Sequence, residues 1–454
     1  MSDPNDYTVG WISASSIEAT AAAAFLDDMH ENLSSKARGD HNTYILGRIG
    51  QHNVAIAVLP DGEPGIAAAA DVASDMLLTF RNVRIGVLVG IGGGAPSSVN
   101  DIRLGDVVVS SNDNEHGGHG GVFQYDYGKT IQEQEFRYTG HLNRPPRALR
   151  TAVTAVRSRH QLRGPQIKEK VQAIISTNRH LEKSFRSPDP RTDRLYKSSV
   201  VHPPNTRRPC WEVCGDGFAK VVQREERSGS AEGPAVHYGL IASANQEMRD
   251  ALLRDKFFEE KGVLCFEREA AGLMNSFPCL VIRGICDYAD THRNKDWQAY
   301  AALTAAAYAK DLLSQVVPDQ VEAERPAKPS AGPPPSGDNN HIGNISQPTD
   351  TPHPGATSQP GGTSHHGGAS HPVETTSLVA ITNLAAIASP AAFPNPVAFT
   401  TPAVHLQPAA SHTQDVPASP LPGSIRAQSI KKESDTSSRK KSTPRFCETR
   451  PASK

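Results

Sequence analysis

Four acidic side chains lie just after predicted strands, where the sheet of an α/β protein binds its ligands. They are Glu18, Glu267, Glu269 and Asp287. A buried carboxylic acid of raised pKa can protonate a leaving group, and an ionised carboxylate can accept hydrogen bonds from hydroxyls or orient a water molecule. Each of the four also has an ordinary explanation, such as a favourable charge at the start of a helix. Their joint placement at strand ends predicts a site for acid–base chemistry.

A run of small residues follows a central predicted strand. Ile91, Gly92 and Gly93 stand at its end, and glycine lets a ligand approach the backbone closely. Neither GxGxxG nor GxxxxGK[ST] occurs in the chain, so dinucleotide and P-loop sites are not indicated.

A sheet is needed to position these residues. In the first 317 residues, predicted strands and helices alternate along the chain. Strands are predicted at 7–14, 44–49, 53–59, 84–91, 107–111, 238–243, 263–266 and 279–285. Helices are predicted at 17–33, 65–79, 146–159, 246–257, 270–275 and 297–316. Several of the strands are continuously apolar, as strands covered on both faces are. The pattern predicts an α/β fold with a mixed, mostly parallel central sheet flanked by helices.

Composition divides the chain of 454 residues into a domain at 6–317 and a tail at 318–454. The tail holds 21 of the 35 prolines and neither Trp nor Tyr, which predicts disorder. Within the domain, 180–233 is a polar, proline-bearing stretch that predicts a long insertion. The net charge of −1 argues against a globally basic nucleic-acid binder, so a nucleic-acid partner is not expected.

Six cysteines show no disulfide framework, which favours reduced thiols in the cytoplasm or nucleus. The chain opens with a polar segment and has no apolar run of about 20 residues, so no membrane segment is expected. Cys210 and Cys214 stand at CxxxC spacing in the insertion, and a metal site would need two further ligands such as His202. We therefore predict no metal site.

Five segments in this order resemble the nucleoside phosphorylase/nucleosidase superfamily, the purine and uridine phosphorylase-like proteins. They are Val87–Gly94, Gly105–Ser111, Tyr238–Asn245, Cys265–Gly272 and Arg283–Asp290. The chain most closely resembles the N-terminal nucleoside-phosphorylase-like domains of filamentous-fungal NLR-type proteins. The resemblance covers roughly 6–316, and no Walker motif or repeat follows it.

The resemblance implies roles for the candidate residues. Asp287 falls on the acid that protonates the leaving purine, and Glu269 on the carboxylate that holds the ribose hydroxyls. Ile91, Gly92, Gly93, Ser243 and Glu267 fall on positions that face or frame the substrate. The implied activity is cleavage of the N-glycosidic bond of a purine nucleoside or nucleotide, with no cofactor.

Two positions depart from the family pattern. Arg268 stands between the two glutamates where relatives carry Met, and Ala244 replaces the glycine that usually follows Ser243. The Arg268 guanidinium could bind a phosphate of a nucleotide substrate, or it could pair with Glu267 or Glu269 and block the ribose site.

The nucleophile separates two enzyme classes. Phosphorylases of the superfamily place arginines where this chain has Glu18 and Leu88, and a carboxylate repels phosphate but can orient or deprotonate water. We therefore expect hydrolysis, with phosphorolysis as the alternative. A further alternative is an inactive nucleoside-binding sensor.

Partners are expected at two levels. The resemblance implies a homo-oligomer, to which the loop 112–128 could contribute His116 or His119. The tail could recruit proteins. Its end, from Ile425, carries basic clusters. These clusters suit nuclear import or polyanion binding, or they are simply part of a solvated charged terminus.

Overall fold

The computed structural model describes residues 2–111, 120–206, 208–227, 232–277 and 279–328. The predicted tail beyond residue 328 and the histidines at 116 and 119 lie outside the described residues. Within the described part, no helix combines the length and the apolar composition that crossing a bilayer requires.

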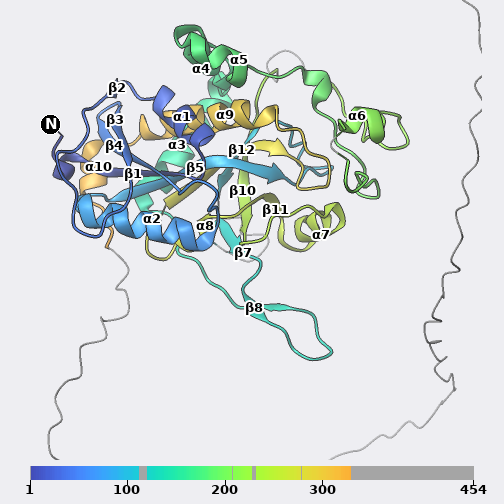
Figure 1. Ribbon diagram of the computed structural model, residues 1–454, viewed down its shortest axis with the longest axis horizontal. Helices are drawn as coiled ribbons and strands as arrows, with labels where there is room; N and C mark the ends of the chain where they lie inside the picture. The colour runs from blue at the N-terminus through green and yellow to red at the C-terminus, as the bar shows by residue number, and fades with distance from the viewer. Residues whose placement is uncertain (1, 112–119, 207, 228–231, 278, 329–454) are drawn as a thin grey trace, which may run out of the picture. The chain divides into compact units, whose positions relative to one another are not determined.

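The described residues form one large sheet with helices on both faces (Figure 1). The strands are β1 Val9–Ser13, β2 Asp28–Met29, β3 Tyr44–Ile49, β4 His52–Val58, β5 Ile85–Gly94, β6 Val107–Ser110, β7 Val122–Gln124, β10 Val236–Ser243, β11 Val263–Glu267 and β12 Cys279–Asp287. A separate hairpin pairs β8 Gly128–Lys129 with β9 Arg137–Tyr138. The helices are α1 Ser16–Ala24, α2 Ile66–Thr79, α3 Arg147–Arg163, α4 Ile167–Thr177, α5 Arg179–Phe185, α6 Cys210–Val213, α7 Ala251–Lys261, α8 Ala270–Leu273, α9 Trp297–Leu313 and α10 Pro318–Glu322.

The strand order is β11-β10-β6-β12-β5-β1-β4-β3-β2, with β7 beside β10. The pairs β1–β4, β1–β5, β5–β12, β6–β10, β7–β10 and β10–β11 are parallel, while β6–β12, β5–β11, β3–β4 and β2–β3 are antiparallel. The predicted mixed, mostly parallel α/β sheet flanked by helices is therefore confirmed.

β11 also pairs with the end of β5, where Cys265 and Phe266 lie opposite Gly94 and Gly93. This second pairing closes β5, β12, β6, β10 and β11 into a ring. It brings the carboxyl ends of β5, β11 and β12 together, so the acidic residues predicted at strand ends meet at one edge.

Helices α2 and α9 cover opposite faces of the sheet. Met76 of α2 packs over Gly10 on one face, and a Cβ at Gly284 would collide with the carbonyl oxygen of Ala301 in α9 on the other. The glycine at position 284 therefore lets α9 lie directly on β12. The core between these layers is apolar and buried, from Trp11 in β1 to Leu312 in α9.

Several predicted boundaries differ from the observed ones. The first helix ends at Ala24 rather than at residue 33, because the next residues pair with β3: Asp27 N–H donates to Arg48 O and His30 N–H to Leu46 O. Helix α7 begins at Ala251 rather than at residue 246, because Asp250 accepts hydrogen bonds from Leu252 and Leu253 N–H as its N-cap. Helix α4 was not predicted.

The ordered packing also continues past residue 317, the predicted end of the domain. Val321 of α10 is buried, Ala327 N–H donates to Val83 O at 2.9 Å, and Arg84 donates to the carbonyls of Glu322 and Glu324 at 2.7 Å. These contacts hold residues 318–327 against the domain.

Candidate active site

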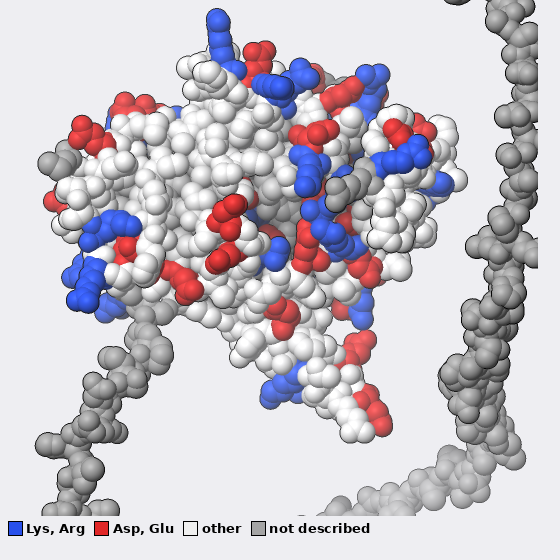
Figure 2. All heavy atoms as spheres, in the orientation of Figure 1, with Lys and Arg blue, Asp and Glu red and all other residues white. Residues whose placement is uncertain are grey.

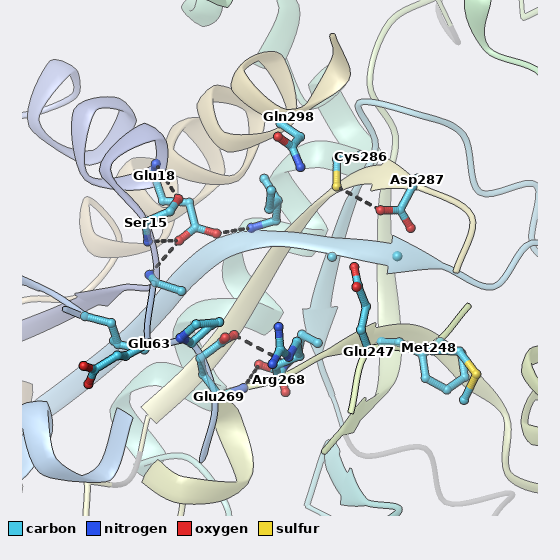
Figure 3. Close-up of a pocket in the computed structure, with 18 of the residues that line it drawn as sticks. Ser15, Glu18, Glu63, Glu247, Met248, Arg268, Glu269, Cys286, Asp287 and Gln298 are labelled. Atoms are coloured by element: carbon cyan, nitrogen blue, oxygen red, sulfur yellow. Dashed lines mark hydrogen bonds between the residues drawn. The ribbon is translucent and has the colours of Figure 1, made fainter. Parts of the chain in front are cut away.

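A cavity of about 680 Å³ opens at the carboxyl ends of β1, β5, β11 and β12. It is lined by most of the predicted site residues, namely Glu18, Ile91, Gly92, Gly93, Glu267, Arg268, Glu269 and Asp287. The face of the molecule in Figure 2 is hollowed near its centre, and acidic and basic side chains rim the hollow. In the view of Figure 3, Glu18 and Asp287 lie at opposite ends of the cavity, with Arg268 and Glu269 below.

Glu18 is held at the start of α1 by backbone N–H groups. Its Oε2 accepts from Ala14 N–H at 2.6 Å and Ser15 N–H at 2.9 Å, and its Oε1 accepts from Ile91 N–H at 2.8 Å (Figure 3). Ser15 Oγ accepts from Glu18 N–H in return, which completes a capping box. The carboxylate thus starts α1 and bridges to β5. Oε1 accepts only one of these hydrogen bonds and so retains a lone pair, whereas both lone pairs of Oε2 are used.

Arg283 of β12 is fully buried between carboxylates. Its Nη2 donates to Glu267 Oε2 and, at 3.0 Å, to Glu269 Oε2, and its Nη1 lies 4.0 Å from Glu18 Oε1. One guanidinium therefore links three of the predicted site residues. No described residue donates to Oε1 of Glu269, which leaves that oxygen available to a ligand.

Three buried carboxylates, Glu18, Glu267 and Glu269, surround this one guanidinium. Burial raises the pKa of Glu269 to about 7, against the opposing effect of Arg283 and with a further increase from Glu267. Burial likewise raises the pKa of Glu18 above its usual value. Burial alone would lower the pKa of Arg283, but the carboxylates outweigh burial and raise it, so the arginine stays charged.

Glu267 and Ser243 hold the backbone that carries Glu269. Glu267 accepts from Glu269 N–H at 3.1 Å and from Ala270 N–H at 3.0 Å, and Ser243 Oγ accepts from Ala271 N–H at 3.0 Å. Both side chains therefore satisfy free N–H groups at the start of α8. Ser243 is fully buried and does not line the cavity, so the structure places it as a support rather than on the predicted substrate surface.

Asp287 ends β12 beside Gly93 of β5. Its Oδ1 accepts from Ala289 N–H at 2.9 Å, and the thiol of Cys286 donates to Oδ2 at 3.5 Å. Burial raises the pKa of Asp287, so its protonated form is favoured relative to a carboxyl in water. The nearest cation in an ion pair is Arg293, whose Nη2 lies 4.0 Å from Oδ2 and also pairs with Glu247.

The glycines of β5 make room for these side chains. A Cβ at Gly93 would lie 2.7 Å from Asp287 Oδ1, and a Cβ at Gly92 would lie 2.6 Å from Cys265 Sγ. Ile91 contributes its N–H to Glu18, and its carbonyl accepts from Arg283 Nη1 at 3.4 Å. These positions therefore shape the site through the backbone.

Arg268 lies at the cavity without pairing with either neighbouring glutamate. Its Nε donates to Asn245 O at 3.2 Å, and it has no ion pair with any described carboxylate. The predicted internal pairing of Arg268 with Glu267 or Glu269 is therefore not observed, because Arg283 occupies that place.

Sequence reasoning missed Arg283, Glu247 and Arg293. Arg283 lies within the RGICDYAD segment that was singled out for Asp287, but strand spacing alone does not show that its guanidinium reaches across to β11. Glu247 and Arg293 line the cavity from loops with no motif around them.

No protein-family model matches the chain. A curated relative, the nucleotide-binding leucine-rich repeat (NLR)-like protein of Hyaloscypha variabilis, is 44% identical over 324 residues, which are 71% of this chain. The match spans only 30% of the relative's length.

Similar solved structures are enzymes of bacteria. Futalosine hydrolase of Helicobacter pylori has a TM-score of 0.41 at 15% identity, covering 68% of this chain and 97% of that one. The 5′-methylthioadenosine/S-adenosylhomocysteine nucleosidases of H. pylori and Neisseria meningitidis each have a TM-score of 0.42 at 14% identity, covering 68% of this chain and 98% of theirs. At these values the similarity assigns no activity to this chain. The resemblance to fungal NLR-type proteins that the sequence motifs predicted is confirmed by the Hyaloscypha relative.

Proposed function

We propose that the cavity cleaves the N-glycosidic bond of a purine nucleoside or nucleotide, by hydrolysis. The observation that carries the proposal is the placement of Asp287, a carboxyl of raised pKa at the cavity beside the small residue Gly93. A departing purine needs a proton or hydrogen-bond donor at a ring nitrogen, and a carboxyl whose pKa is raised by burial can supply one near neutral pH.

Glu269 suits the ribose side of such a substrate. Its Oε2 is held by Arg283, whereas its Oε1 has no donor among the described residues and borders the cavity. A fixed carboxylate with a free oxygen accepts a hydrogen bond from a sugar hydroxyl. Glu267 and Ser243 act as positioning residues, since they fix the turn that presents Glu269.

Glu18 supports water as the nucleophile. Three backbone N–H groups fix its carboxylate at the cavity, and a fixed carboxylate can orient a water molecule or accept its proton. Leu88, at the position where phosphorylases of the superfamily carry an arginine, is fully buried in β5 and offers nothing to a phosphate nucleophile. These two positions favour hydrolysis over phosphorolysis.

Arg268 bears on the substrate class. It lines the cavity and has no carboxylate partner among the described residues, so its guanidinium can pair with a phosphate of a nucleotide. The same observation weakens the alternative of an inactive sensor, since Arg268 does not occupy the acceptor oxygens of Glu269. The homo-oligomer and the tail-mediated partners stay predictions.

The test is the product formed from purine nucleosides and nucleotides with and without inorganic phosphate. We expect free base plus ribose or ribose phosphate, at a rate that phosphate does not increase. Ribose 1-phosphate as the main product would replace hydrolysis by phosphorolysis, and no base release from any nucleoside or nucleotide would favour the sensor.

A further inference from the structure

A second cluster of reactive side chains lies in the predicted insertion, apart from the acidic cavity. His202, Cys210 and Cys214 converge there, and their ligand atoms all lie within 4.8 Å of one another. We propose that these three side chains bind a zinc ion, which crosslinks the insertion next to the loop that follows Asp287.

The local fold presents the two sulfurs together. Cys210 begins the short helix α6 and Cys214 is its C-cap, with Cys214 N–H donating to Cys210 O at 2.7 Å. Residues four apart in a helical turn lie on the same face, so both thiols point to the same side. Cys214 is buried and Cys210 is half-buried, and neither forms a disulfide.

The distances between the ligand atoms fit a tetrahedral metal site. His202 Nδ1 lies 3.4 Å from Cys210 Sγ and 3.3 Å from Cys214 Sγ. With Zn–S of about 2.3 Å and Zn–N of about 2.05 Å, the S···N edge of a tetrahedral site is about 3.5 Å. A single ring nitrogen either accepts or donates one hydrogen bond, so it cannot satisfy two thiols at once. One cation between the three atoms satisfies all of them.

The donor set also selects the metal. Two thiolates and one neutral imidazole are typical zinc ligands, and two thiolates cancel the charge of a divalent ion in this partly buried place. His292 packs edge-on against the ring of His202, with centroids 6.0 Å apart, and neither of its ring nitrogens has a hydrogen-bond partner among the described residues. Its Nδ1 lies 3.4 Å from Asp290 Oδ2. His292 is thus a candidate for the fourth position, which water can also fill.

The cluster connects two parts of the chain that flank the cavity. His202 N–H donates to Thr291 Oγ1 at 2.8 Å, four residues after Asp287. Farther along the insertion, Arg224 donates to the Tyr288 hydroxyl at 2.9 Å and pairs with Asp193 at 3.0 Å. A metal at the cluster would therefore hold His202 at the point where its backbone contacts the segment 287–292.

The experiment is metal analysis of the full chain, purified without a metal-affinity tag. We expect about one zinc ion per chain, lost in His202→Ala, Cys210→Ala and Cys214→Ala. Cys447→Ala, a cysteine of the tail, is the matched control and should retain the zinc. Replacing zinc by Co²⁺ in the unmutated chain should give a sulfur-to-cobalt charge-transfer band, a readout that does not depend on the variants folding.

Limited proteolysis adds a structural readout. Removing the metal with a chelator should increase cleavage within 197–227, while cleavage of the segment 147–163 stays unchanged. Three results would each overturn the proposal. The first is a metal-free wild type that gives no cobalt–sulfur band when Co²⁺ is added. The others are a Cys210–Cys214 disulfide found by mass spectrometry and equal zinc loss in Cys447→Ala. None of these results depends on whether the acidic cavity cleaves nucleosides.

Discussion

The guanidinium of Arg283 donates to the carboxylate of Glu269 across 3.0 Å, and so joins strand β12 to the turn after β11. The same nitrogen donates to Glu267. Because Arg283 is on the strand that ends at Asp287, one side chain sets the position of Glu269 relative to Asp287. The site is therefore organised around a buried cation that none of the sequence motifs singled out.

Removing that cation should destabilise the fold. Arg283→Met leaves Glu267 and Glu269 buried without their partner, and breaking a buried pair in this way costs about 3–5 kcal/mol. Denaturant unfolding measures the loss of free energy. Arg268→Met is the matched control, because Arg268 is not buried and has no ion pair, and it should change stability by about 0.5 kcal/mol or less. Equal stability of the two variants would show that the Arg283 cluster does not support the fold.

Glu18→Gln should lower the kcat of base release by about 10²–10⁴, the usual contribution of a positioned general base. The amide cannot accept a proton from water, and its NH₂ group would face one of the backbone N–H donors that now hold the carboxylate. Ser15→Ala is the control: it removes the other half of the capping box, at about 1 kcal/mol of stability, but keeps the carboxylate. If Ser15→Ala lowered kcat as much, Glu18 would act only by starting α1.

The pKa of Glu269 predicts how activity changes with pH on the acid side of the profile. Burial raises its pKa to about 7, and the ionised form is the one that accepts a sugar hydroxyl. Activity should therefore rise with pH as Glu269 ionises around pH 7. The pH dependence of kcat/KM measures this rise. Glu269→Gln should lose it, and an unchanged profile in this variant would remove Glu269 from the titration.

The variant Arg268→Met tests whether Arg268 gives the site a preference for nucleotides over nucleosides. A charge-assisted contact to phosphate contributes about 1.5–3 kcal/mol, so the wild type should favour nucleotides by about ten- to a hundredfold. The variant should lose this preference while nucleoside cleavage persists, as measured by kcat/KM for matched pairs such as adenosine and ATP. Activity that appears only in the variant would mean that Arg268 blocks the wild-type site.

The strand-end carboxylates and the small residues of β5 could be predicted because each is marked by its position after an apolar run. The residues that pair with these carboxylates could not be predicted. Arg283 stands inside a continuously buried strand, and strand spacing does not show which buried charge it meets across the closed ring. Ser243 is the last residue of a predicted strand, but its hydroxyl faces the start of α8 rather than the cavity.

The boundaries that were wrong depended on competing backbone partners. Residues 25–33 have helical composition, yet Asp28 and Met29 form the edge strand β2 against β3, and α1 ends at Ala24. The cysteine pair at 210 and 214 had regular spacing, but the sequence does not show that His202 lies beside it, with its backbone bonded to Thr291 far away in sequence. Contacts between distant segments of this kind are set by the packed fold and leave no local pattern.

The measurement that tests the account most directly is the rate of free purine release by the wild type and by Asp287→Asn, with circular dichroism to show that both are folded. The asparagine side chain keeps the size of Asp287 and can still accept from Ala289 N–H, but it has no acidic proton. We expect base release by the wild type and a kcat lower by about 10²–10⁴ in Asp287→Asn. Equal rates in the two folded proteins would contradict this expectation.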